Sequence, residues 1–174
     1  MHTSRRSFLK IGILGALTLA AGGALYRAVQ GPAQLRPFAL DDNARSVLTA
    51  IIPSMLGPVL PTAQPARAAA VAGTVERVAG AVHGLPLATQ KEVQDLFGLL
   101  SLGPARRFLA GVPASWNEAT PAQADAFLHS WQHHRIAMLV TAYQALHDLI
   151  AGAWYSDPAC WEAIGYPGPI KELS

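Results

Sequence analysis

Charged side chains are scarce in this chain of 174 residues. Lysine, arginine, aspartate and glutamate together make up 14% of it, against about 25% in a typical soluble domain. Residues 1–30 hold four of the basic residues, so the rest of the chain keeps nine basic and eleven acidic residues, a net charge of −2. A nucleic-acid-binding domain needs basic residues clustered on its folded body, so nucleic acid is not an expected partner. A body so poor in charge favours a buried interface with another protein.

Cysteine is limited to Cys160. A single cysteine excludes an internal disulfide, and the lack of a C-x-x-C-H motif excludes covalently attached haem. Three alternatives remain open for this thiol in an oxidising compartment: it is buried, it is free and exposed, or it forms an intermolecular disulfide with a partner.

The motifs of common enzyme classes are missing as well. No G-x-G-x-x-G follows a predicted strand, so binding of flavin or nicotinamide by this chain is unsupported. No nucleophile elbow gathers serine, histidine and aspartate. We therefore expect no catalytic residue and no cofactor site in this chain.

A histidine cluster in "HSWQHHR" is the nearest approach to a metal site. His129 and His133 have the i, i+4 spacing of metal ligands, and His134 follows them. No glutamate lies between them as in a zinc hydrolase, and His147 is about four helical turns further on. We interpret the cluster as an ordinary helix face and expect no metal; a metal- or haem-dependent enzyme that uses these histidines is the least favoured alternative.

The N-terminus carries an export signal. In "SRRSFLK" two adjacent arginines precede the remaining motif residues, and an uncharged run over 11–26 follows. This pattern matches the consensus for the twin-arginine translocase, which carries folded proteins across the bacterial inner membrane. The residues of the export signal are Arg5, Arg6, Phe8, Leu9 and Lys10.

The signal predicts a periplasmic location and a division of the chain. The apolar run is shorter than the roughly 20 residues of a membrane-spanning helix and contains glycines. Retention as an inner-membrane anchor nevertheless stays open, as does cleavage after the small residues at 20–24. We predict a signal peptide or anchor over 1–30, a linker over 31–40 and a helical domain over 41–174.

The body of the chain predicts helices and no strand. Apolar residues recur on one face after Asp41, up to a proline at 53 that should end or kink the helix, and again from Pro65 to about residue 82. A third helix should begin at a capping box formed by Thr89 and Glu92, and a short one should cover 104–109. The longest helix should run from Thr120 to about residue 152, some 45 Å, and face a partner along part of its length. The predicted fold is all-α, a small bundle of about four to five helices.

The C-terminal segment "WYSDPACWEAIGYPGP", residues 154–169, is rich in aromatic residues. Asp157 and Pro158 should start a short helix, Gly165 should end it in a left-handed conformation, and a Pro-Gly turn should follow. Two alternatives remain open for the aromatic side chains. They cap the bundle as part of its core, or they anchor a partner, as tryptophan and tyrosine often do.

Residues 155–169 resemble the closing signature of the gluconate 2-dehydrogenase subunit 3 family, the small subunits of periplasmic flavin dehydrogenases. The signature residues here are Tyr-Ser-Asp-Pro at 155–158 and Trp-Glu-Ala-Ile-Gly-Tyr-Pro-Gly-Pro at 161–169. The twin-arginine leader and "AIIPSML" at 50–56 are similar to the family as well, whereas 62–115 carries no matching motif.

The resemblance implies a non-catalytic subunit. In such complexes the large subunit is a glucose-methanol-choline (GMC) type flavoprotein that binds FAD and oxidises a sugar or alcohol. The small subunit supplies the leader for both, and electrons pass to a cytochrome c subunit or another acceptor. The alternative is a stand-alone periplasmic binding or scaffold protein. On the family reading the partner interface comprises Trp154, Tyr155, Asp157, Pro158, Trp161, Ile164, Gly165, Tyr166 and Pro167. The intermolecular disulfide stays one of the three alternatives for Cys160, independently of the resemblance.

Overall fold

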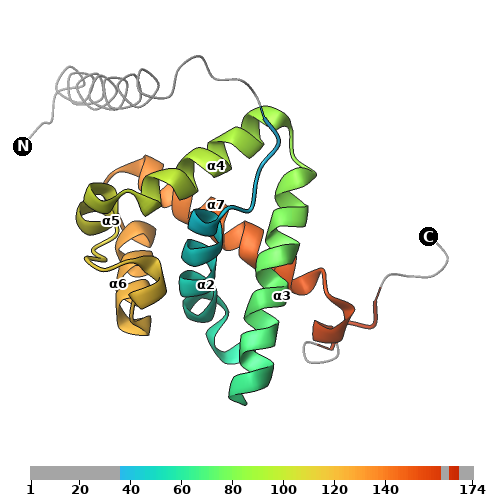
Figure 1. Ribbon diagram of the computed structural model, residues 1–174. Coiled ribbons are helices and arrows are strands. Elements are labelled where there is room, and N and C mark those ends of the chain that lie inside the picture. Colours follow the sequence, from blue (N-terminus) through green and yellow to red (C-terminus); the bar gives the residue numbers. More distant parts are fainter. Residues whose placement is uncertain (1–35, 162–164, 169–174) are drawn as a thin grey trace, which may run out of the picture. The chain divides into compact units, whose positions relative to one another are not determined.

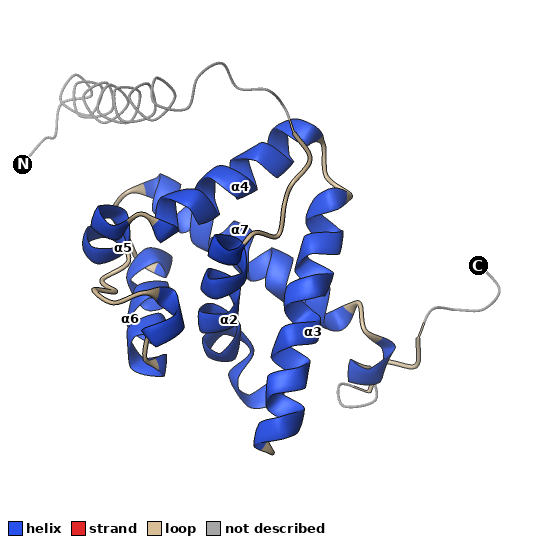
Figure 2. Cartoon of the chain, in the orientation of Figure 1, coloured by secondary structure: helices blue, strands red, loops and turns tan. Residues whose placement is uncertain are grey.

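The computed structural model describes residues 36–161 and 165–168. Every described residue belongs to one compact unit. The residues of the predicted export signal, and Ile164 of the predicted partner interface, therefore lie outside the described residues. Within these residues the chain forms α-helices and short 3-10 helices and no strand (Figure 2), which confirms the all-α prediction.

Six α-helices form the described unit (Figure 1), one more than the five segments expected. The 3-10 helices are η1 (Gly57–Val59), η2 (Trp116–Glu118) and η3 (Pro158–Cys160). The α-helices are α2 (Asp42–Leu56), α3 (Gln64–His83), α4 (Leu87–Ser101), α5 (Gly103–Leu109), α6 (Pro121–Gln132) and α7 (Ala137–Tyr155).

Helix α2 is the central element, in contact with α3, α4, α6 and α7. The Asp41 side chain caps it by accepting a hydrogen bond of 2.8 Å from the Ala44 amide. Pro53 does not end the helix, which runs three residues further. Ile52 and Leu56 are buried on either side of the proline, and their packing holds the last turn in place. The buried face of α2 comprises Ala44, Val47, Leu48, Ile51, Ile52 and Leu56.

The start of α4 differs from the predicted capping box. The helix begins at Leu87, so Thr89 lies inside it and caps nothing at its start. The buried Gln90 side chain fixes this turn: its Nε2 donates to the carbonyls of His83 (3.1 Å) and Leu85 (2.8 Å), and its Oε1 accepts from the Phe38 amide (2.9 Å). Contacts distant in sequence thus override the local capping signal.

The prediction of one long helix over 120–152 is wrong. Thr120 caps α6 as predicted, but α6 ends at Gln132, with His133 as C-cap, and α7 begins only at Ala137. The two helices contact each other and both contact α2. A straight helix of 45 Å could not bury both halves against α2, so the argument that its excess length faces a partner does not hold.

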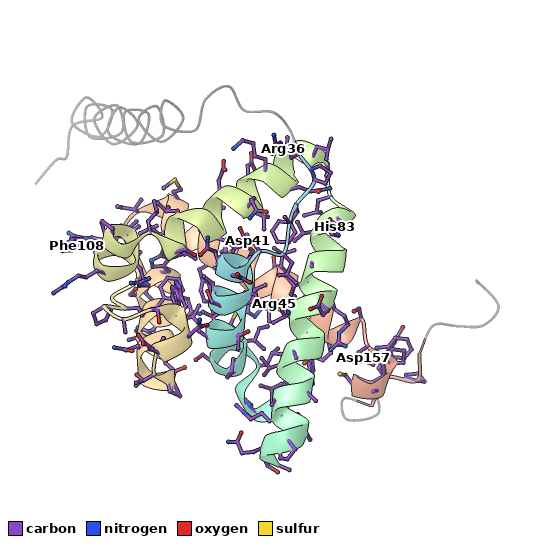
Figure 3. All side chains as sticks on the ribbon, in the orientation of Figure 1. Arg36, Asp41, Arg45, His83, Phe108 and Asp157 are labelled. Atoms are coloured by element: carbon purple, nitrogen blue, oxygen red, sulfur yellow. The ribbon has the colours of Figure 1, made fainter. Side chains whose placement is uncertain are left out.

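The described end of the predicted linker is part of the core. Phe38 is buried. Its ring lies edge to face with the His83 ring at a centroid distance of 6.0 Å, and it is tilted against the Phe97 ring at 6.2 Å. His83 Nε2 lies 2.8 Å from the Phe38 carbonyl oxygen. Residues 36–40 are therefore fixed against α3 and α4, near the labelled His83 in Figure 3.

Candidate partner-binding surfaces

The C-terminal segment begins at the end of α7, where two side chains enter the core. Trp154 and Cys160 are both buried. Between them Asp157 caps η3: its carboxylate accepts from the Ala159 amide (3.0 Å) and its carbonyl from the Cys160 amide (3.0 Å). The predicted helix start at Asp157 and Pro158 is confirmed, but η3 is a single 3-10 turn that ends at Cys160 and not at Gly165.

Arg77 of α3 fastens this segment to the body. Its guanidinium forms an ion pair of 3.0 Å with Asp157 (labelled in Figure 3) and donates from Nε to the Ala153 carbonyl at 2.9 Å. It also donates to the Thr74 hydroxyl at 3.3 Å. A Cβ at Gly73 would lie 3.3 Å from Arg77 Nη1, so the glycine leaves room for the arginine. One side chain thus links α3 to the end of α7 and the start of η3.

Trp161 and Tyr166 form a small cluster outside the core. The Trp161 indole donates to the Tyr155 carbonyl (2.8 Å), and the Tyr166 amide donates to the Trp161 carbonyl (2.9 Å). The two rings lie edge to face with centroids 5.2 Å apart. Gly165 has φ +70°, which confirms the predicted left-handed conformation. Gly168, at φ +93°, passes so close to Trp161 that a Cβ there would lie 3.2 Å from the ring.

The aromatic residues of the segment therefore differ: one lies in the core, and others lie on the surface, where they are available to a partner. Trp154 packs in the core and is covered by the chain itself, so it follows the first alternative. Asp157 forms the ion pair with Arg77, which we call the Arg77 clamp, and caps η3, although its side chain stays partly exposed. Tyr155 and Tyr166, 39% and 46% exposed, are available on the surface, as are Pro158, Gly165 and Pro167, while Trp161 is half-buried.

Of the three alternatives for Cys160, the structure shows the first: the thiol is buried and free. Burial raises the pKa of this thiol above its ordinary value of 9.0, the carboxylate of Asp157 raises it further, and Arg77 acts in the opposite direction. An intermolecular disulfide at Cys160 would require the η3 turn to open first, because a thiol must be exposed and ionised to attack a disulfide.

The histidine cluster lies where α6 ends. The rings of His129 and His133 have centroids 4.6 Å apart, and His133 Nδ1 is 3.2 Å from the His129 carbonyl oxygen. His134 Nδ1 accepts from the Ile136 amide at 3.1 Å. His147 pairs instead with Asp148 at 3.2 Å. Among the described residues no three histidine, cysteine, aspartate or glutamate side chains are grouped as a metal site would need.

A second exposed surface was missed by the sequence analysis. Phe108 of α5 is 82% exposed, and Leu109 after it and Leu102, the N-cap of α5, are also exposed. Arg106 and Arg107 precede Phe108, and the stretch 96–117 holds no aspartate or glutamate. We call Leu102, Arg106, Arg107, Phe108 and Leu109 the α5 surface. The acid-free run around "ARRFL" is the signal that would have identified it.

An apolar groove lies between the end of α3, the start of α4 and α7. Its volume is about 340 Å³, and Leu85, Val93 and Leu149 line it, with Asp148 among the few polar residues. No single helix in the described part of the chain has the length and hydropathy of a membrane span, although α2 with η1 and α3 pass the same test as a pair bent by 117°.

Comparison of the whole chain with protein-family models, with curated proteins and with solved structures found no match in any of the three.

Proposed function

We propose that this chain is the non-catalytic small subunit of a periplasmic FAD-dependent GMC-type dehydrogenase that oxidises a sugar or an alcohol. It supplies the leader with which the folded, FAD-loaded large subunit crosses the inner membrane through the twin-arginine translocase, and it then stabilises that subunit. Electrons leave the complex through a cytochrome c subunit or another acceptor.

The observation that carries this proposal is the twin-arginine motif on a chain without a cofactor motif. Arg5 and Arg6 direct the chain to a route for folded proteins, yet no nucleotide-binding or haem motif gives this chain a reason to fold before export. A partner that binds its cofactor in the cytoplasm supplies the reason. The resemblance of residues 155–169 to the small-subunit signature names the partner's class.

The geometry of the C-terminal segment supports the same proposal. Tyr155 and Tyr166 are exposed, and tyrosine is enriched where proteins bind one another. The Arg77 clamp and the Trp161 hydrogen bond hold these residues in place before any partner arrives. A surface ordered in advance loses less conformational entropy on binding. The stand-alone binding or scaffold protein remains the alternative, and it predicts a chain that is stable and monomeric without a partner.

Export of the two subunits provides the test. The full chain, carrying a C-terminal affinity tag, is purified from the periplasm of its source organism and examined for flavin absorbance and for a larger polypeptide. We expect FAD bound to a large subunit that has no leader of its own. Changing Arg5→Lys and Arg6→Lys together should leave both polypeptides and the FAD in the cytoplasm, because one leader serves both.

A matched control is Arg27→Lys, which changes a basic residue outside the motif and should leave export unchanged. The proposal fails if the purified chain carries no flavoprotein. It also fails if the flavoprotein reaches the periplasm when this chain does not.

A further inference from the structure

The α5 surface presents the most exposed large apolar side chain of the described residues. Phe108, 82% exposed, lies on the outer side of α5 in Figure 3. An isolated exposed apolar residue is common on monomeric proteins, but this one is followed by exposed Leu109 and preceded by two arginines, and Leu102 at the start of α5 is exposed as well. The combination of an aromatic anchor, leucines and arginine is typical of protein interfaces.

The backbone under this surface is held rigidly. The indole of buried Trp131 donates to the Leu109 carbonyl (2.8 Å), and that of buried Trp116 donates to the Leu100 carbonyl (2.8 Å). After α5 the chain turns back through Gly111, at φ +68°, and the Val112 amide donates to the Arg106 carbonyl at 3.1 Å. Val112 is fully buried. Two indoles and a closed turn therefore fix a helix that has one face without a partner in the described unit.

Arg106 and Arg107 have guanidinium hydrogen-bond donors that no acceptor in the described part of the chain uses. Arg106 Nε is buried without a hydrogen-bond partner, and its Nη1 reaches the Ser101 carbonyl only at 3.5 Å. Arg107 forms no hydrogen bond or ion pair within residues 36–161 and 165–168. Both line a hollow beside Phe108 that Pro104 and Pro113 also line. An arginine binds a carboxylate through two parallel hydrogen bonds, so this hollow suits an acidic side chain.

We infer that the α5 surface is a second docking site for the large flavoprotein subunit, separate from the C-terminal segment. Phe108 enters an apolar pocket of that subunit, and carboxylates at the rim of the pocket pair with Arg106 and Arg107. This inference rests on the proposed function, because it names the flavoprotein as the partner. Charge complementarity is the reason for an acidic partner: the stretch 96–117 carries two positive charges and no negative one.

Other occupants fit the surface less well. A second copy of this chain that packed the same surface on itself about a two-fold axis would bring four arginines into one interface with no carboxylate from the stretch 96–117, and like charges repel. An anionic membrane would meet two cations on a helix of seven residues, which is small beside the amphipathic helices that bind membranes by themselves.

The experiment measures binding of the flavoprotein subunit, separated from the purified complex, to the full chain and to its variants. Phe108→Ala should weaken binding at least about thirtyfold, as expected for a central aromatic anchor. Arg107→Gln should slow association and reduce its dependence on salt. Because Phe108 and Arg107 are exposed, circular dichroism and thermal unfolding of the variants should match those of the unchanged chain.

The matched controls are Val59→Ala, an exposed apolar residue of η1, and Arg45→Gln, an exposed arginine of α2 (labelled in Figure 3); neither should change binding more than twofold. Binding that survives Phe108→Ala overturns the inference while leaving the proposed function intact. The inference is also overturned if Phe108→Ala leaves flavoprotein binding intact but abolishes either binding to vesicles of equal phosphatidylglycerol and phosphatidylethanolamine or self-association of the chain. If the unchanged chain binds no flavoprotein, the proposed function fails, and this inference fails with it.

Discussion

Removal of the Arg77 guanidinium should open the C-terminal turn without unfolding the bundle. The change is Arg77→Met, which keeps the length and apolar stem of the side chain but loses the ion pair with Asp157 and the hydrogen bond to the Ala153 carbonyl. Cys160 lies in that turn, is buried, and is the one cysteine of the chain. Its thiol therefore reports when the turn opens.

The size of the effect follows from the two contacts. The side chains of Arg77 and Asp157 are only 29% and 31% exposed, so the ion pair should contribute about 1 kcal/mol, the upper end for a pair near the surface. A hydrogen bond from a charged group to a carbonyl contributes about 1.5 kcal/mol. Together they stabilise the closed turn by roughly 2 to 3 kcal/mol, so their loss should raise the open fraction roughly 30- to 140-fold.

The assay is the rate at which a water-soluble maleimide labels Cys160 in the folded protein at constant pH. We expect Arg77→Met to accelerate labelling by that factor, while the far-ultraviolet circular dichroism stays that of a helical bundle. Asp157→Asn removes the charge and keeps an oxygen that can cap η3, so it should accelerate labelling only about fivefold.

The control is Arg45→Met. Arg45 pairs with Glu76 at 2.7 Å, but the two side chains are 46% and 60% exposed, so labelling should change less than twofold. An unchanged labelling rate in Arg77→Met would refute the view that Arg77 holds the turn. Equal acceleration by Arg45→Met would show that general destabilisation, and not the clamp, exposes the thiol.

Two further predictions concern buried groups. Gln90→Leu should lower the free energy of unfolding in urea by about 2 to 4 kcal/mol, because it leaves the Phe38 amide and the carbonyls of His83 and Leu85 without their partner; a loss under about 1 kcal/mol would contradict this account of the α3–α4 turn. The raised pKa of the Cys160 thiol means that the unfolded chain loses its proton first, so this group's contribution to stability is constant well below pH 9.0 and falls as the pH rises through that value toward the folded-state pKa. The difference in unfolding free energy between the unchanged chain and Cys160→Ala should therefore shrink between neutral pH and pH 10, and a constant difference would refute it.

Much of the fold is visible in short stretches of sequence. The valine stripe of α3, at 71, 75, 78 and 82, is buried as its spacing predicts. Asp41, Thr120 and Asp157 cap helices where the sequence places them, and Gly165 is left-handed. Each cap depends on a side chain and a backbone amide within three residues of one another, and the left-handed turn depends on a glycine at one position, so the local sequence contains the information that these features need.

The candidate surfaces were harder to predict. Trp154 and Tyr155 are neighbours of the same chemical kind, yet one is buried and the other exposed, because successive helical residues point in directions about 100° apart. Which direction faces the core depends on where α3 lies beside α7. Phe108 resembles a core residue in sequence, and only the packing of α5 on α4 leaves it outside.

The sequence by itself determined that the described residues form helices and no strand, and where α2, α3 and α6 begin. Tertiary structure alone decided that Gln90 sets the start of α4, that α6 and α7 are two helices, and that Arg77 reaches across 80 positions to hold Asp157. The physical reason is the range of the interactions. Caps and apolar periodicity act within one or two turns, whereas a buried side chain or an ion pair depends on segments that only the folded chain brings together.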